Sequence, residues 1–380
     1  MIRIISHKIL LPNCIYDGNI YIDEGKIVSV SKEEIECEKV IDLSDYYVSP
    51  GFIDIHTHGG GGYSFSGSVD DIINAANFHF SHGTTTICPT ISADDFGFMK
   101  KSVINVSNAM TDKRAKGTIL GAHLEGPYLS DKQAGAQSPD CITDPIEEDY
   151  LPLLKEYKNA ISRWTYAPER KGADKFEKAL KQYGIVASAG HTDAILSDMS
   201  RAIDNGCFLV THLYSCTSTI TRDHGFRKLG VVETALLRDE LCVELICDGK
   251  HLPKELIQLV YKIKGADKIA LITDSLMLAG TSEKHGFMQR TEFIIEDGVC
   301  KLVDRSAFAG SIATSDVLLN VAVKEANIPI VDAVKMLTQT PARIMNISNK
   351  GIIEKGKDAD FVVFDDDLGI QKVFANGVEK

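Results

Sequence analysis

The sequence predicts an α/β protein, a (β/α)8 TIM-type barrel with a small β-sandwich domain formed from both chain ends. Through the middle of the chain, short apolar runs alternate with amphipathic stretches, whereas both ends hold β-rich runs separated by turn residues. No G-x-G-x-x-G follows the first strand candidate, which argues against an open doubly wound sheet. We therefore expect a small domain from residues 1–50 and 346–380 and a barrel from residues 51–345.

The two chain ends resemble each other in their β-forming residues and their turns. Asp17-Gly18 and Asn376-Gly377 are turn sequences that favour hairpins. We expect the strands of both ends to join in one β module. These strands are Ile2–Ile5, Gly18–Asp23, Lys26–Val30, Lys39–Leu43, Tyr46–Val48, Phe361–Phe364 and Gln371–Asn376.

Eight strand candidates lie between the chain ends, and helix candidates follow them, which is the number that closes a barrel. An additional hairpin is expected within Thr281–Val303, around the turn Glu296-Asp297-Gly298. The expected strands are Phe52–His56, Thr84–Pro89, Ile119–Leu124, Ile161–Ala167, Ile185–Ala189, Phe208–His212, Cys242–Ile246 and Lys268–Thr273. The expected helices are Asp70–Phe80, Ala93–Met110, Ile146–Tyr157, Ala173–Tyr183, Ile195–Asn205, Val231–Leu237, Lys254–Ile263, Ser315–Ala326 and Ile330–Leu337.

Composition limits the classes of partner and the compartment. The chain has 380 residues, and its formal charge of −12 argues against nucleic acid and anionic membranes as partners. No apolar run approaches the roughly 20 residues of a membrane span, and the first residues do not read as a signal peptide. The nine cysteines contain no C-x-x-C pair and favour reduced thiols. We expect a cytoplasmic protein.

Polar residues fall at the expected C-terminal ends of the strands, where the catalytic groups of such barrels lie. Side chains two residues apart on a strand face the same way, so two imidazoles of the first strand point together. An aspartate that closes an apolar strand is costly to bury without a partner. The ends of strands one, three, five, six and eight carry, in this order, His56 and His58, Glu125, His191, His212 and Asp274.

This set of residues indicates metal-dependent hydrolysis. Neutral imidazoles and a carboxylate are suitable ligands for a divalent cation, and the cation lowers the pKa of a bound water towards 7. Asp274 is then placed to accept the proton of the water and to deliver it to the leaving group.

The strand ends read GFIDIHTHGG, HLEGPYL, AGHTDA, THLY and ITDS, and a later segment reads TPARIMN. These motifs resemble those of the amidohydrolase superfamily, and more closely those of its N-acetylglucosamine-6-phosphate deacetylases. The resemblance covers nearly the whole chain. The fourth strand lacks the metal-bridging lysine that is typical of the dihydroorotase and dihydropyrimidinase branches. The resemblance implies that Glu125, His191 and His212 bind the principal metal and that Asp274 is the catalytic acid and base. His56 and His58 allow a second metal, so we expect one or two divalent ions (Zn, Fe or Mn) per subunit.

The resemblance also implies a substrate, N-acetylglucosamine 6-phosphate, which is hydrolysed to glucosamine 6-phosphate and acetate. In the family, an arginine after strand six and the histidine after strand seven contact the phosphate. The histidine is His251 here, and Arg222 and Arg227 are both candidates for the arginine, with Arg222 favoured. The family arginine is often donated across a dimer interface, so we expect a homodimer. The alternative for either arginine is a surface ion pair with Asp223.

Two stretches depart from the family pattern. Gln137 stands where the family often has a histidine that binds the amide carbonyl, and Ser215 and Cys216 replace residues that surround the sugar. Ala309 lies in the loop that lines the family pocket. Alternative substrates are therefore N-acetylgalactosamine 6-phosphate or an N-acyl amino acid. An alternative of a different class is a non-catalytic barrel that binds a sugar phosphate.

Overall fold

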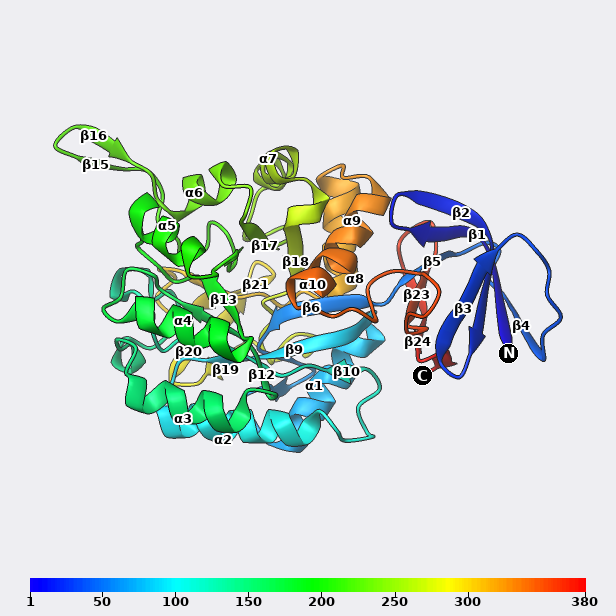
Figure 1. Cartoon of the computed structure of the whole chain (residues 1–380), viewed down its shortest axis with the longest axis horizontal. Coiled ribbons are helices and arrows are strands. Elements are labelled where there is room, and N and C mark those ends of the chain that lie inside the picture. Colours follow the sequence, from blue (N-terminus) through cyan, green and yellow to red (C-terminus); the bar gives the residue numbers. More distant parts are fainter.

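Parallel strands form a nearly closed barrel in the middle of the chain, and the computed structural model, which describes residues 1–380, confirms the predicted fold class (Figure 1). Strand β6 pairs with β9, and the order then runs through β11, β12, β13, β14, β17 and β18. The bounds are β6 Phe52–Thr57, β9 Thr84–Ser92, β10 Thr118–Ile119, β11 Ala122–Glu125, β12 Ile161–Tyr166, β13 Val186–Ala189, β14 Leu209–Val210, β17 Cys242–Ile246 and β18 Ile269–Ile272.

No strand pairing joins β18, the eighth strand, to β6, the first. Instead, the residues that follow β18 close the barrel through main-chain hydrogen bonds. The main-chain N–H of Asp274 donates to the carbonyl of His56 at 2.9 Å, and that of His58 donates to the carbonyl of Ser275 at 2.8 Å. Below this point, the Thr273 hydroxyl donates to the Asp54 carboxylate at 2.5 Å. The first and eighth strands therefore meet at the ends that carry the predicted site residues.

Helices surround the barrel, and local sequence explains where they begin and end. Helix α1 begins with a capping box between Ser68 and Asp71, and α4 ends at Gly184, whose φ of 73° suits a left-handed C-cap. The helices are α1 Val69–Ser81, α2 Phe96–Ala109, α3 Glu147–Tyr157, α4 Ala173–Tyr183, α5 Leu196–Asp204, α6 Val231–Leu237, α7 Lys254–Lys264, α8 Ser315–Asn320, α9 Ile330–Leu337 and α10 Gln339–Ile344.

Two helical features differ from the sequence prediction. The helix expected over Ser315–Ala326 is α8 followed by a π-helical turn at Val321–Glu325. Helix α10 was not predicted, because it has only six residues and contains a proline, so it carries little periodic signal.

Strands from both chain ends pair in one sheet beside the barrel, at the right of Figure 1. The first half of β1 pairs with β4 and its second half with β5, and the pairing of β1 with β2 shifts its register between Ser6 and Ile9. A separate apolar core that includes Ile4 and Ile20 from one end and Phe361 and Phe374 from the other fills this unit. The strands are β1 Ile2–Leu11, β2 Cys14–Asp23, β3 Lys26–Ser31, β4 Lys39–Asp42, β5 Tyr47–Pro50, β23 Phe361–Phe364, β24 Ile370–Ala375 and β25 Val378–Glu379.

Short antiparallel hairpins extend from the loops of the barrel. The insertion expected over Thr281–Val303 forms a four-stranded antiparallel sheet that continues as far as Gly310. The hairpin strands are β7 Gly59–Gly60, β8 Tyr63–Ser64, β15 Thr221–Asp223, β16 Phe226–Lys228, β19 His285–Met288, β20 Thr291–Glu296, β21 Val299–Leu302 and β22 Phe308–Gly310.

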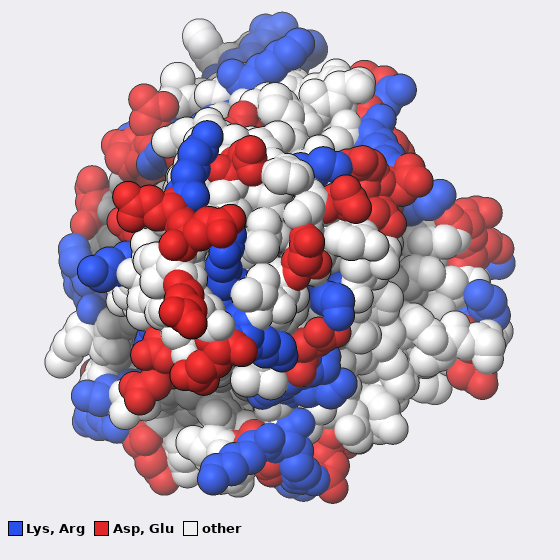
Figure 2. All heavy atoms as spheres, turned by 90° about the vertical axis from the view of Figure 1, so that its right-hand side faces the viewer, with Lys and Arg blue, Asp and Glu red and all other residues white.

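The surface that carries the terminal sheet shows basic and acidic side chains mixed together, without a large area of one sign (Figure 2). No helix combines the length and the apolar character needed to span a bilayer.

Candidate metal centre

A cavity of about 260 Å³ lies at the C-terminal ends of the barrel strands, where the active sites of this fold are built. Its lining includes the carboxylates Glu125 and Asp274 as well as the apolar or aromatic side chains Tyr214, Met288 and Phe308. A cavity of this size with a few polar groups is typical of a small-molecule site.

Tight turns at the strand ends aim several of these side chains. His191, His212 and Asp274 follow β13, β14 and β18 with φ values of 47°, 27° and 48°. Positive φ values are uncommon in residues other than glycine, with asparagine, aspartate and histidine the most frequent exceptions, and such conformations concentrate at functional sites. The backbone therefore turns sharply at the three points where the sequence predicts site residues.

The first cluster forms around one oxygen of Glu125. Glu125 Oε1 lies 3.2 Å from His191 Nε2 and 3.1 Å from His212 Nε2. The two imidazole nitrogens are themselves 3.1 Å apart. His191 Nδ1 donates to the carbonyl of Gln133 at 2.9 Å, so the Nε2 of a neutral ring presents a lone pair to the cluster.

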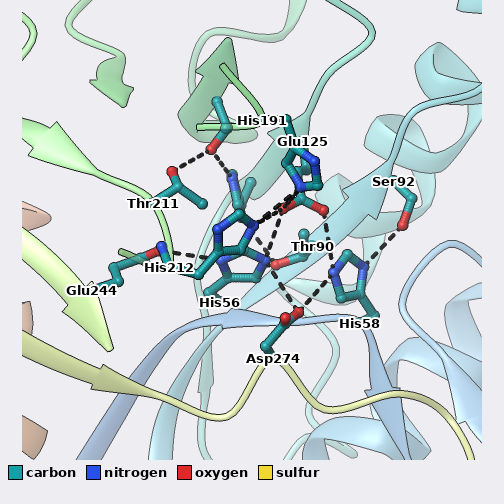
Figure 3. Close-up of polar contacts among 12 residues, drawn as sticks. His56, His58, Thr90, Ser92, Glu125, His191, Thr211, His212, Glu244 and Asp274 are labelled. Atoms are coloured by element: carbon teal, nitrogen blue, oxygen red, sulfur yellow. Dashed lines mark hydrogen bonds and ion pairs between the residues drawn. The ribbon is translucent and has the colours of Figure 1, made fainter. Parts of the chain in front are cut away.

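The second cluster shares Glu125 and adds His56, which lies in β6, and His58, which directly follows that strand (Figure 3). His56 Nε2 lies 3.3 Å from Glu125 Oε1 and 3.5 Å from Asp274 Oδ1. His58 Nε2 lies 3.3 Å from Glu125 Oε2 and 3.2 Å from Asp274 Oδ1. Asp274 therefore faces both imidazoles of the first strand.

The donor set of both clusters fits a divalent cation. Lone pairs and carboxylate oxygens converge within 4.8 Å in each cluster, and every residue of the clusters is buried. His56 Nε2 is buried and has no hydrogen-bond partner, although it faces two carboxylates. Imidazole nitrogen and carboxylate oxygen are the ligands that Zn²⁺ and other first-row divalent cations accept.

The electrostatics of the clusters also favour positive charge. Burial lowers the pKa of His56, but the charges of Glu125 and Asp274 outweigh burial and raise the pKa to about 10. Burial raises the pKa of Glu125, but His56 and His191 outweigh it and hold the pKa well below its usual range. The carboxylates therefore remain ionised and attract a cation.

A further imidazole, His123, lies next to the clusters but is satisfied by hydroxyl groups. Its Nδ1 is 3.0 Å from Thr90 Oγ1, and its Nε2 is 2.7 Å from Thr165 Oγ1. Burial, followed by the charge of Arg163, holds its pKa well below the usual value. His123 is therefore a neutral structural residue.

Two charged residues beside the clusters were missed by the sequence analysis. Glu244 lies in β17 and accepts a hydrogen bond from His56 Nδ1 at 3.2 Å, and Arg163 of β12 pairs with Glu244. Both side chains are fully buried. The sequence did contain a signal for both residues, because a charged side chain inside an apolar strand, like that of Asp274 at the end of one, is costly to bury without a partner.

Five of the seven predicted substrate residues lie at the wall of the cavity. Ser215, Cys216, His251 and Ala309 line the cavity, as does Gln137. The Gln137 amide donates to Glu125 Oε2 at 2.7 Å, so in this structure it orients a carboxylate. His251 Nδ1 is 2.8 Å from Asp248 Oδ2, which leaves His251 Nε2 for another partner.

Arg222 and Arg227 lie elsewhere, on the exposed hairpin β15–β16 that projects from the barrel (Figure 1). Neither lines the cavity of its own chain. Asp223 pairs with Lys228 at 2.6 Å, so the ion pair considered as an alternative for the arginines is formed by another residue. Within one chain, His251 is therefore the predicted phosphate ligand that reaches the cavity.

Comparison with known proteins agrees with this geometry. Residues 47–380 match the amidohydrolase family. An N-acetylglucosamine-6-phosphate deacetylase from Bacillus subtilis (strain 168) is 31% identical over 96% of this chain and 92% of that protein. An N-acetylgalactosamine-6-phosphate deacetylase from Shewanella sp. (strain ANA-3) is 29% identical over 94% of this chain and 90% of that protein.

A solved structure extends the comparison to three dimensions. The crystal structure of N-acetylglucosamine-6-phosphate deacetylase from Pasteurella multocida superposes with a TM-score of 0.93 at 27% identity. The match covers 100% of this chain and 99% of that one. The resemblance predicted from the motifs is confirmed, and the chain belongs to the amidohydrolase family, in the group that includes the N-acetylglucosamine-6-phosphate deacetylases.

Proposed function

We propose that the protein is a metal-dependent deacetylase that hydrolyses the acetamide of N-acetylglucosamine 6-phosphate to glucosamine 6-phosphate and acetate. The observation that carries the proposal is the convergence of Glu125 with four imidazoles beside the carboxylate of Asp274, at the wall of one cavity. Relatives that align with more than nine-tenths of this chain are named for this activity.

The ligands of the principal metal are Glu125, His191 and His212, and those of a second are His56, His58 and Glu125. A bound cation would polarise the amide carbonyl and lower the pKa of the attacking water. Zn²⁺, Fe²⁺ and Mn²⁺ all accept this set of nitrogen and oxygen ligands.

Asp274 transfers the proton. Its pKa is lowered because the charges of His56 and His58 outweigh the effect of burial, so it enters the reaction as a base. It accepts a proton from the attacking water and then donates it to the nitrogen of the leaving amine. The amide of Gln137 holds Glu125 in place and lies at the cavity wall, within reach of a bound acetamide.

The phosphate requires positive charge that one chain does not supply fully. His251 reaches the cavity, whereas Arg222 and Arg227 stand on the exposed hairpin. We propose a homodimer in which the hairpin of one subunit brings an arginine, Arg222 in the first place, to the phosphate in the cavity of the other.

A second candidate substrate is N-acetylgalactosamine 6-phosphate. Ser215 and Cys216 line the cavity in place of the usual family residues, and a relative that is 29% identical is named for that sugar. The two sugars differ only at the C4 hydroxyl. The residues around this hydroxyl, and not the metal centre, therefore decide between them.

We propose a cytoplasmic location, which the nine free cysteines support. We also propose that residues 1–50 and 346–380 form a unit distinct from the barrel of residues 51–345. The separate apolar core of the terminal sheet supports this division.

The experiment is a rate comparison with purified protein loaded with Zn²⁺, Fe²⁺ or Mn²⁺ in turn. Acetate release is measured from N-acetylglucosamine 6-phosphate, N-acetylgalactosamine 6-phosphate, unphosphorylated N-acetylglucosamine and an N-acetyl amino acid. We expect the highest kcat/KM with N-acetylglucosamine 6-phosphate. A higher value with the galactose isomer changes the sugar but leaves the reaction in place. No acetate release with any metal overturns the proposal.

A further inference from the structure

A fully buried ion pair between Arg163 and Glu244 lies behind the metal clusters. The two residues stand on the barrel strands β12 and β17. Removal of two charges from water costs several kcal/mol per ion, and buried ion pairs seldom add net stability over apolar residues of similar volume. A stabilising role alone therefore does not explain why the barrel contains this pair.

The two oxygens of Glu244 have different partners. Oε1 pairs with Arg163. Oε2 lies 3.2 Å from His56 Nδ1 and also accepts the main-chain N–H of His212 at 3.2 Å. An ionised carboxylate only accepts hydrogen bonds, so His56 carries its hydrogen on Nδ1. Its Nε2 is then the atom that faces Glu125 and Asp274.

Arg163 fixes the position of Glu244 within the barrel. Its guanidinium also donates to the carbonyl of Ile55 at 3.2 Å and to the hydroxyl of Thr211 at 2.9 Å. These acceptors precede His56 and His212 in the chain. One guanidinium thus holds the strands that carry ligands of both clusters, in addition to the carboxylate that orients His56.

His56 differs from the other imidazoles in this respect. Outside the clusters, His58 contacts the Ser92 hydroxyl at 3.0 Å and His191 donates to a carbonyl. His212 Nδ1 is buried without a hydrogen-bond partner. Of the four rings, His56 alone donates to a carboxylate behind it. Such a carboxylate fixes the tautomer of a metal-binding histidine and increases its basicity.

We propose that Glu244, held by Arg163, is a positioning residue that makes the His56–His58–Glu125 cluster a binding position for a second divalent cation. The inference rests on the proposed function in taking this cation to be the metal of the deacetylase. Glu244 contacts the ring of only one ligand, His56, whereas its contact with His212 is to the main-chain N–H and not to the imidazole. Its loss should therefore weaken the His56–His58–Glu125 position more than the Glu125–His191–His212 position.

The test measures metal binding, using Zn²⁺ as the probe. Metal-free wild-type protein and Glu244→Gln are titrated with Zn²⁺ in the presence of a competing chromophoric chelator, which gives the number of positions and the Kd of each. We expect two positions in the wild type. In Glu244→Gln, we expect one Kd to rise 10- to 100-fold and the other to change less than about threefold. His58→Ala, which lacks a ligand of the same position, should give a similar isotherm.

Glu177→Gln is the matched control, because Glu177 is an equally buried carboxylate paired with Arg201 and lies outside the clusters. It should lose stability without a change in either Kd. Should Glu244→Gln fail to fold by circular dichroism, Glu244→Asp replaces it, since it keeps the charge beside Arg163 but withdraws the oxygen from His56. The same selective weakening is expected of Glu244→Asp.

Three results would overturn the inference. These are a wild-type protein with a single Zn²⁺ position, a Glu244 variant that folds and keeps both wild-type Kd values, and equal weakening of both positions. Acetate release by the wild type is measured separately. Its absence contradicts the proposed function. Acetate release together with a single wild-type Zn²⁺ position contradicts the second metal and the role of Glu244, whereas acetate release together with either of the other two results contradicts only the role of Glu244.

Discussion

The main-chain N–H of Asp274 donates to the carbonyl of His56 at 2.9 Å, and the side chains of the same two residues face each other with Oδ1 and Nε2 3.5 Å apart. This contact joins the end of the eighth barrel strand to the first. The proposed proton carrier is therefore fixed by the backbone to the strand that carries two imidazoles of the metal centre. Rigid placement of this kind allows a carboxylate to reach the same reacting atoms in each turnover.

Replacement of Asp274 by Asn should separate proton transfer from metal binding. The amide keeps the shape of the side chain but cannot accept the proton of water, so kcat should fall by about 10²- to 10⁴-fold. Zn²⁺ content, measured by elemental analysis, should stay at the wild-type value. The control Asp316→Asn removes a carboxylate that contacts His82 outside the cavity, and kcat should be unchanged. Full activity of Asp274→Asn would remove Asp274 from the mechanism.

Glu125 is common to both clusters, so its loss should affect both metal positions. In Glu125→Gln, the neutral amide no longer balances the charge of a divalent cation. We expect dialysed protein to retain less than about a tenth of the wild-type metal, with loss of acetate release in proportion. The control Glu177→Gln should retain its metal. A Glu125→Gln protein that keeps two equivalents of metal would contradict the shared position.

Removal of the metal should abolish activity without unfolding the chain, because large apolar cores hold the barrel and the terminal sheet together. After treatment with a chelator, we expect acetate release to stop and the far-ultraviolet circular dichroism to be retained. The thermal midpoint should fall by several degrees, since a ligand that binds only the folded state stabilises it. Addition of Zn²⁺, Fe²⁺ or Mn²⁺ should restore the rate. Full activity in protein shown to be metal-free would exclude the metal mechanism.

Arg222→Ala should weaken binding of the phosphate specifically. Loss of one charge-assisted hydrogen bond, worth about 1.5–3 kcal/mol, corresponds to a KM about 10- to 150-fold higher for the phosphorylated sugar. The rate with the unphosphorylated sugar should stay the same. Arg227→Ala is measured in parallel and should have the smaller effect. Arg238→Ala, which removes a partly buried arginine that pairs with Glu240 and does not line the cavity, is the control.

Mixed dimers test whether the arginine crosses between subunits. Neither Asp274→Asn nor Arg222→Ala has a complete site, but a mixed dimer of the two has one site with both residues if the arginine belongs to the other subunit. We therefore expect mixing under exchange conditions to raise the rate at low substrate concentration above that of either variant. If the rate of the mixture is only the average of the rates of the two variants, Arg222 either serves the site of its own subunit or does not bind the phosphate.

Lys350 should make the stability of the terminal sheet depend on pH. Its ammonium group lies 2.9 Å from Asp358 and 2.5 Å from Asp360, with only 8% of its side chain exposed. Burial lowers the pKa of Lys350 but the two carboxylates raise it overall, whereas Lys26 and Lys350 lower the pKa of Asp358 against the effect of burial.

The sign of each shift defines the pH window. A carboxylate whose pKa is lowered in the folded state stabilises the fold at pH values above its ordinary pKa near 4. This stabilisation is lost as the pH falls through the folded-state pKa. A lysine whose pKa is raised in the folded state stabilises the fold at pH values below its ordinary pKa near 10. This stabilisation is lost as the pH rises through the folded-state pKa. Lys350→Met should therefore reduce the free energy of unfolding by about 3 kcal/mol at pH 7, with a smaller loss below pH 4. Urea unfolding at several pH values measures this, and a loss that is independent of pH would contradict it.

The strand ends illustrate what could be predicted from sequence. The barrel strands and most helices lie within a few residues of their expected ranges, because hydrophobic periodicity and turn residues are local signals. The ends of parallel strands share one edge, so the order of the strands was enough to bring His56, Glu125, His191, His212 and Asp274 to one mouth. The family resemblance then indicated which reaction these residues catalyse, the hydrolysis of an acetamide.

By itself, therefore, the sequence determined the fold class, the family and the residues that meet at the barrel mouth. Only the tertiary structure decided how these residues are supported. It placed Glu244 behind His56, turned the Gln137 amide towards Glu125 and set Arg222 on a projecting hairpin. The reason is physical: the partner of a side chain depends on distances and directions across the barrel, and residues far apart in the sequence set these together.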